Sequence, residues 1–127
     1  MNPSELKQCT KDFAKRVIKL IEALPKNTTT GVMGKQLLRS STSVGANYRA
    51  VCRAKSRADF IAKLCIVEEE FDESLYWLEM LVETNQIKLP LVAELMKEGE
   101  EILAIIVASA KTARMQTNPQ SKIANPK

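Results

Sequence analysis

Lysine and arginine side chains in the first half of the chain are the residues whose type and spacing can do chemistry. Between residues 35 and 57 they recur at near-helical spacing, and residues 28–54 contain no Asp or Glu. Cationic groups along a helix face can neutralise phosphates without reading bases, so the pattern indicates a surface that can hold RNA or DNA. The candidate nucleic-acid-binding residues are Arg39, Arg49, Arg53, Lys55 and Arg57. A second basic row, at i, i+4 spacing, consists of Lys7, Lys11, Lys15 and Lys19.

The same basic residues have a second interpretation, in which they pair with carboxylates. Residues 1–67 hold 13 Lys or Arg against 4 Asp or Glu, whereas residues 68–127 hold 6 against 11. The two halves can therefore neutralise each other within the fold or between subunits. Carboxylates of the run at residues 68–73 can meet Arg39, Arg49 or Arg53 on a preceding helix. The sequence leaves both interpretations open.

Catalytic and metal chemistry has little support in the residue types. The chain has no histidine, which removes the commonest general base, the Ser-His-Asp triad and every zinc site that uses His. The serines at 40–43 lack a positioned base, and the acidic run at 68–73 lacks the Glu-x-x-His pairs of di-iron bundles. We therefore expect no catalytic residue, no cofactor and no metal site, and a protein that is not an enzyme.

The cysteine count and the hydropathy pattern indicate a soluble, cytoplasmic protein with no membrane partner. The three cysteines, Cys9, Cys52 and Cys65, form no CxxC motif, so we interpret them as small buried apolar residues in a reducing compartment. The longest fully apolar run, residues 102–108, is far shorter than the ~20 residues of a membrane span.

The apolar periodicity predicts four amphipathic helices, over residues 4–24, 32–54, 57–83 and 90–115. Ser4 and Ser56 are the predicted N-caps, and Pro90 suits a first helical turn. Short connections between long helices favour an all-α, antiparallel up-down-up-down four-helix bundle over residues 1–116, followed by a disordered polar tail over 117–127. The predicted core stripe of the last helix is Leu91, Leu95, Ile102 and Ile105.

The third and fourth helices carry more apolar residues than one bundle needs, which suggests a second buried face and hence self-association. A thicker core is the alternative. The residues beside the main stripes are Ile61, Ile66, Tyr76, Trp77, Leu81, Val92, Ile106 and Val107. In the second helix, the small polar residues Ser40, Ser43 and Asn47 are predicted to make hydrogen bonds between helices, because burying them unpaired costs about 1–3 kcal/mol each.

The segment Arg39-Ser40-Ser41-Thr42-Ser43-Val44-Gly45-Ala46-Asn47 resembles the bacterial four-helix-bundle family of the 23S rRNA intervening-sequence protein. The likeness continues through residues 55–61 and 70–79. It implies an antiparallel bundle that assembles into a ring of five, similar to the accessory proteins of diversity-generating retroelements, whose basic rings engage nucleic acid and a reverse transcriptase. The family often has an acidic residue and Gly after the Asn, whereas this chain has Tyr48-Arg49-Ala50.

Two functional hypotheses follow. The first is a non-enzymatic, ring-forming homo-oligomer that binds RNA or DNA through phosphate contacts on its basic helix faces. The second is a protein-binding adaptor, for example for a reverse transcriptase, that uses the apolar faces of the third and fourth helices.

Overall fold

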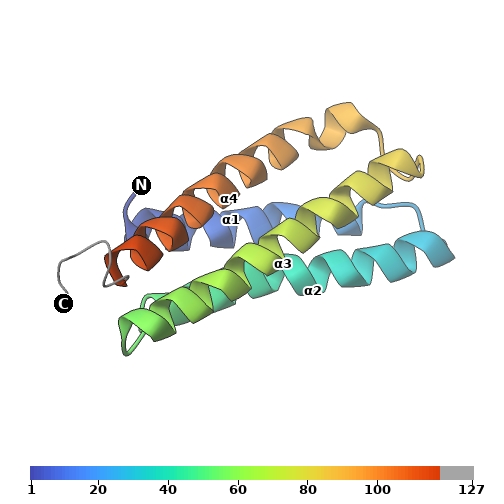
Figure 1. The fold of residues 1–127 in the computed structure, drawn as a ribbon. Helices are drawn as coiled ribbons and strands as arrows, with labels where there is room; N and C mark the ends of the chain where they lie inside the picture. Colours follow the sequence, from blue (N-terminus) through green and yellow to red (C-terminus); the bar gives the residue numbers. More distant parts are fainter. Residues whose placement is uncertain (118–127) are drawn as a thin grey trace.

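The computed structural model describes residues 1–117, which form four helices: α1 (Pro3–Glu22), α2 (Thr28–Val51), α3 (Arg57–Glu83) and α4 (Leu89–Thr117) (Figure 1). The predicted all-helical fold with four helices is confirmed. Of the predicted tail, Thr117 closes α4, and residues 118–127 lie outside the described residues.

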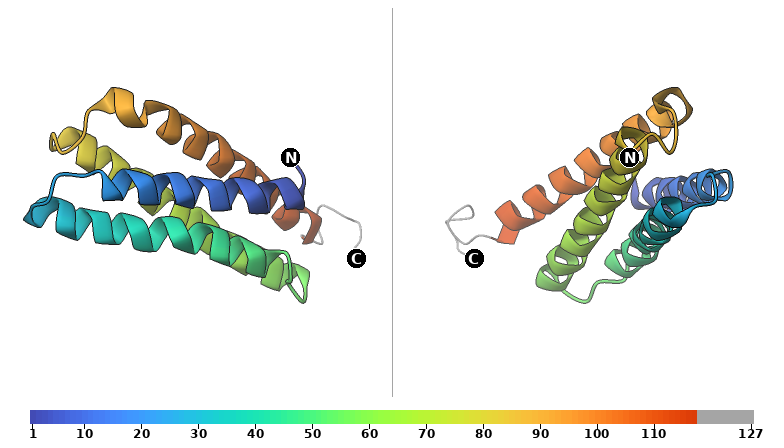
Figure 2. Two further views of the ribbon diagram at one scale, coloured as in Figure 1. Left: turned by 180° about the vertical axis from the view of Figure 1, so that it is seen from behind. Right: turned by 90° about the vertical axis from the view of Figure 1, so that its right-hand side faces the viewer.

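The helices pack side by side as a bundle. The α1–α2 and α3–α4 turns lie at one end, and the N-terminus, the α2–α3 turn and the end of α4 lie at the other (Figures 1 and 2). Within residues 1–117, backbone contacts join α1 to α2 and α4, α2 to α3, and α3 to α4. Helices α1 and α3 therefore occupy opposite corners of the bundle.

Asparagine caps decide where the first two helices begin. The Asn2 side chain accepts a hydrogen bond from the Glu5 backbone N–H at 2.8 Å, so the prediction of Ser4 as the N-cap is wrong. Asn27 accepts from the Thr30 backbone N–H at 2.9 Å, and α2 consequently begins at Thr28, four residues earlier than predicted. A cap satisfies backbone donors at the helix start, and this outweighs the weak helix propensity of Thr and Gly.

The boundaries of α3 agree with the prediction, whereas α2 ends at Val51, three residues earlier than expected. The Ser56 side chain caps α3 by accepting from the Asp59 backbone N–H at 3.0 Å. The Asp59 carboxylate does not complete a capping box, because it accepts from the Lys55 backbone N–H at 3.0 Å instead.

The core is mostly aliphatic, as the low aromatic content predicts, with three buried aromatic residues, Phe13, Tyr48 and Phe71. Phe13 of α1 and Phe71 of α3 are fully buried, and their ring centroids lie 4.8 Å apart at the centre of the bundle. These rings contribute large apolar area and hold the two opposite helices at a common level.

The predicted core stripe of α4 is wrong at its first position. Leu91 is 73% exposed, whereas its neighbour Val92 is buried. The core side of α4 consists of Val92, Leu95, Gly99, Ile102, Ile106 and Ala110. Hydropathy alone misses this register because Gly99, which lies at the closest approach to the Phe13 and Phe71 rings, has no side chain to mark it.

The small polar residues of α2 divide between two kinds of hydrogen bond. Ser40 is buried, and its hydroxyl lies 2.9 Å from that of the buried Ser74 on α3, as predicted for a contact between helices. Ser43 donates to the Arg39 carbonyl oxygen at 2.8 Å, and Asn47 donates to the Ser43 carbonyl oxygen at 2.8 Å. Both bonds stay within α2, so the predicted interhelical role of Ser43 and Asn47 is wrong. Backbone carbonyls one turn earlier are the nearest acceptors for short polar side chains.

Substitution of glycine by alanine is expected to have opposite effects on stability at Gly99 and at Gly31. A Cβ at Gly99 would lie 3.0 Å from both a Leu75 and a Phe13 carbon, whereas a Cβ at Gly31 would meet nothing within 4 Å. Overpacking at buried rings outweighs the gain of about 1 kcal/mol in helix propensity. We therefore expect Gly99→Ala to destabilise the protein by about 1 kcal/mol and Gly31→Ala to stabilise it by about 0.5–1 kcal/mol in urea unfolding. Equal shifts for the two variants would contradict the close packing at Gly99.

Candidate nucleic-acid interface

Arg39 forms ion pairs with acidic residues of α3. Its guanidinium lies 3.1 Å from a Glu70 carboxylate oxygen and 2.5 Å from one of Glu73. Of the predicted nucleic-acid-binding residues, Arg39 therefore follows the alternative interpretation, in which the basic helix meets the acidic helix. It stands apart from the remaining four.

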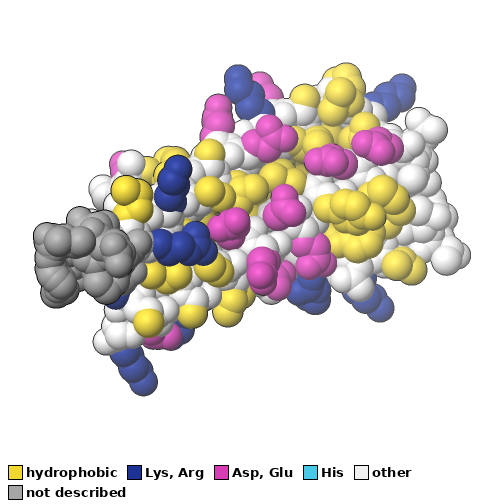
Figure 3. Space-filling model, in the orientation of Figure 1, with side chains coloured by type: hydrophobic (Ala, Val, Ile, Leu, Met, Phe, Trp, Pro, Cys, Tyr) yellow, Lys and Arg dark blue, Asp and Glu magenta, His cyan; other side chains and the backbone are white. Residues whose placement is uncertain are grey.

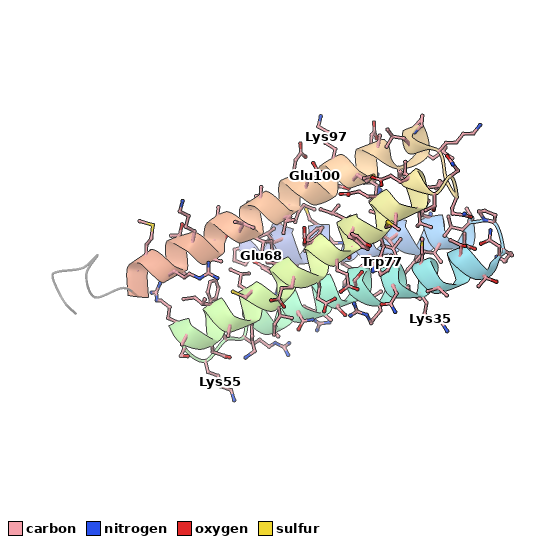
Figure 4. The ribbon with its side chains drawn as sticks, turned by 45° about the vertical axis from the view of Figure 1, so that its right-hand side comes forward. Lys35, Lys55, Glu68, Trp77, Lys97 and Glu100 are labelled. Atoms are coloured by element: carbon pink, nitrogen blue, oxygen red, sulfur yellow. The ribbon has the colours of Figure 1, made fainter. Side chains whose placement is uncertain are left out.

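Glu73 connects this ion pair to Trp77, the single tryptophan of the chain. The Trp77 indole N–H donates to Glu73 Oε2 at 3.1 Å, and Trp77 lies on the side of α3 turned toward α2 (Figure 4). The hydrogen bond from Arg39 and, to a lesser extent, the one from Trp77 lower the pKa of the Glu73 carboxyl, whereas burial opposes this shift.

Arg49 lies on the last turn of α2 and Arg53 lies two residues beyond its end, and together they line an open hollow of about 400 Å³ with Ala46, Ala50 and Lys63. We call this surface the Arg49–Arg53 hollow. Both arginines are exposed, and within residues 1–117 neither has a carboxylate within 4 Å. Their position at the carboxyl end of α2 favours positive charge, because the helix dipole is negative there.

Lys63 is a cation of this hollow that the sequence analysis missed. It belongs to α3, one turn beyond Asp59, and its amine lies 2.6 Å from both Asp59 carboxylate oxygens. That hydrogen bond, together with one from the Lys55 backbone, lowers the pKa of Asp59. The short connection between α2 and α3 could have indicated Lys63, because it brings the first turns of α3 beside the last turns of α2.

A second hollow, of about 530 Å³, adjoins the first between α1 and α2. Lys7, Lys11 and Arg49 line it, so Arg49 belongs to both hollows. At Gly45 of α2, a Cβ would lie 3.6 Å from Thr10 of α1, at ordinary van der Waals distance, so the two helices are in contact here. Cations from three helices thus surround one corner of the bundle.

Acidic side chains outnumber basic ones on the face formed by α3 and α4 (Figure 3). Figure 3 shows acidic side chains among apolar patches across this face, with Lys and Arg gathered mainly toward its edges. The charge division between the two halves of the sequence is therefore also a division in space.

Lys55 lies in the α2–α3 turn and Arg57 is the first residue of α3, and the two form a separate part of the predicted site. Lys55 points away from the bundle (Figure 4), and the Arg57 guanidinium donates to the Gln116 side chain of α4. Both line an open groove of about 1000 Å³ whose apolar wall includes Phe60 and Ile105. The structure thus brings Arg49 and Arg53 together, places Lys55 and Arg57 at the neighbouring end, and separates Arg39 from both pairs.

The excess of apolar residues is smaller than the sequence suggested. Leu81, Val92 and Ile106 are buried in the core of the single chain, as the thicker-core alternative predicts. Ile61 and Trp77 are half-buried. Exposed apolar area beside the main stripes remains at Ile66, Tyr76 and Val107.

The three cysteines are free, and none of them is fully buried. Cys52 is exposed, while Cys9 and Cys65 are half-buried, so the prediction of three buried cysteines is wrong. Cys52 lies one turn after Tyr48, and burial of the Tyr48 phenol, followed by the influence of Cys52, raises the pKa of Tyr48 to about 12.

Among residues 1–117, no three His, Cys, Asp or Glu side chains gather in a way that could hold a metal ion. Over the same residues, no helix has the length and apolarity of a membrane span.

The family model of the 23S rRNA-intervening sequence protein matches residues 3–108, which include all of α1 to α3 and most of α4. The chain belongs to the 23S rRNA-intervening sequence protein family. A solved structure with the same fold, described as a protein of unknown function from the S23 ribosomal protein family of Bacteroides thetaiotaomicron, is 38% identical. The alignment covers 87% of this chain and 99% of that one, with a TM-score of 0.80. No curated protein matches the chain.

For this member of the 23S rRNA-intervening sequence protein family, the Arg39–Glu73–Trp77 connection predicts a pH-dependent fluorescence signal. The depressed pKa of Glu73 keeps its carboxylate charged below the ordinary value of 4.5, so any stability from the pair is present above that value and is lost as the pH falls through the folded pKa. We expect Trp77 fluorescence to titrate below pH 4.5, and Arg39→Met to move the midpoint upward.

Lys35→Met is the matched control, because Lys35 is an exposed cation of the same helix (Figure 4). It should leave the midpoint in place. Circular dichroism separates carboxyl titration from acid unfolding, and a midpoint that Arg39→Met leaves unchanged would contradict the contact.

Proposed function

We propose that the protein is a non-enzymatic homo-oligomer, a ring of antiparallel up-down-up-down bundles, that holds RNA or DNA through phosphate contacts. The observation that carries the proposal is the Arg49–Arg53 hollow. Two exposed guanidinium groups face solvent there without a carboxylate partner within residues 1–117. Arginine suits phosphate geometry because its planar fork can donate two parallel hydrogen bonds.

The chemistry of the hollow favours backbone contacts over base recognition. Among the described residues, no aromatic side chain lines either the Arg49–Arg53 hollow or the adjoining hollow between α1 and α2. Base stacking therefore has no platform at this corner. Cations alone release counterions from a phosphate backbone, which gives affinity without sequence specificity.

Assembly into a ring would multiply the number of cationic sites that one nucleic-acid strand can contact. A few cations on one 14.2 kDa chain give weak binding, whereas several copies on one assembly bind the same strand with a high effective concentration. The turns that alternate between the two ends of the bundle support the antiparallel order (Figure 1). The family resemblance supports a ring of five, and the family name makes RNA the first ligand to test.

The adaptor alternative, with a reverse transcriptase as an example of its partner, has weaker support. Three of the eight apolar residues on which it rested belong to the core of the single chain. The remaining exposed residues, Ile66, Tyr76 and Val107, are also available to a ring contact.

Charge reversal at the Arg49–Arg53 hollow tests the proposal. We expect Arg49→Glu/Arg53→Glu to weaken binding of a short labelled RNA duplex by about tenfold or more, and by a similar factor for duplexes of different sequence. Fluorescence anisotropy at low salt measures the affinity. The control is Lys26→Glu/Lys35→Glu, which makes the same change in net charge at exposed lysines away from the hollow.

Equal losses for the two double variants would mean that net charge, and not the hollow, governs binding. Unchanged affinity in Arg49→Glu/Arg53→Glu would contradict the proposal outright. Circular dichroism must show the same helical signal in all proteins, because loss of the fold would make the two arginines structural residues.

A further inference from the structure

Two exposed rows of opposite charge run along helices at opposite corners of the bundle. The row on α1 consists of Lys7, Lys11, Lys15 and Lys19, all exposed. The row on α3 consists of Glu69, Asp72, Tyr76, Glu79 and Glu83, also all exposed, at steps of three and four residues. At 1.5 Å per residue the rows are about 18 Å and about 21 Å long, so their lengths match.

The rows are largely unpaired among the residues that the structure describes. Among residues 1–117, the one ion pair that involves a member of either row joins Lys15 to Asp12 at a long distance of 3.9 Å. Helices α1 and α3 make no backbone contact with each other, since α2 and α4 separate them. The two rows therefore cannot meet inside one molecule, although their charges and lengths are complementary.

The core fixes the relative height of the two rows. The Phe13 and Phe71 rings meet in the core at a tilt of 45° with centroids 4.8 Å apart, so a residue of α1 lies level with the α3 residue numbered 58 higher. Both helices begin at the end that carries the α2–α3 turn (Figure 1). Lys11 is consequently level with Glu69, Lys15 lies beside the level of Asp72, and Lys19 lies between the levels of Tyr76 and Glu79.

We propose that the lysine row of one copy docks on the acidic row of the next copy, and that this contact closes the ring. The inference rests on the proposed ring and specifies its contact. Rotation about an axis parallel to the helices moves a copy without shifting it along the axis. Rows that are level within one chain therefore stay level between neighbours, which a head-to-tail contact requires.

The contact also has an apolar component. Tyr76 is 49% exposed within the acidic row, and Ile66 is 42% exposed one turn before Glu69. Burial of these two side chains contributes affinity, whereas the charge pairs select the partner and set the register. With α1 and α3 occupied by neighbours, the Arg49–Arg53 hollows of all copies lie on the same side of the ring.

Charge reversal and charge exchange test the contact. We expect Lys11→Glu/Lys15→Glu to reduce the mass measured by light scattering from an oligomer to the 14.2 kDa chain, because like charges then face each other. Glu69→Lys/Asp72→Lys should have the same effect. The protein that carries all four substitutions restores every opposite-charge pair and should recover the wild-type mass.

Lys26→Glu/Lys35→Glu is again the matched control and should keep the wild-type mass. A wild-type oligomer that both double variants preserve, or that the fourfold variant fails to recover, would contradict this contact while leaving the ring intact. A monomeric wild-type protein at tens of micromolar would instead contradict the ring itself, and the contact with it.

Discussion

The packing of a helix without carboxylates against an acidic helix is the constraint on which this structure depends. Helix α2 has no Asp or Glu, so its positive charges can be neutralised only from other elements. Across the α2–α3 boundary this happens at Arg39, which meets Glu70 and Glu73, beside the buried hydroxyl contact of Ser40 with Ser74. At the carboxyl end of α2, Arg49 and the nearby Arg53 are exposed, and the helix dipole and solvent stabilise them instead.

This division produces a molecule whose faces differ in charge. The basic corner at Arg49 and Arg53 suits phosphates, and the acidic row of α3 suits a cationic partner. In our account the two surfaces have separate tasks. The rows on α1 and α3 join copies of the chain, and α2 presents the hollow that contacts nucleic acid. Most residues of the two contacts differ, but Lys11 belongs both to the lysine row and to the hollow between α1 and α2, next to Arg49.

Helix number and the bounds of α3 could be predicted because apolar periodicity and the Ser56 cap are local signals. The starts of α1 and α2 were misplaced because Asn2 and Asn27 compete with nearby residues of equal capping ability. Two features could not be predicted because they depend on tertiary contacts. One is that Val92, and not Leu91, faces the core; the other is which basic residues form ion pairs and which stay open. Arg39 and Arg49 have the same charge on the same helix, and only their distances to α3 carboxylates separate an ion pair from an open site.

The salt dependence of RNA binding measures how many phosphates the protein neutralises. If Arg49 and Arg53 contact phosphates, the logarithm of the affinity falls linearly with the logarithm of the salt concentration. Two arginines per chain then give a slope of about −2 or steeper. The measurement is a titration of wild-type protein with one short RNA duplex from low to moderate salt. A slope near zero, or no binding at low salt, would contradict the account.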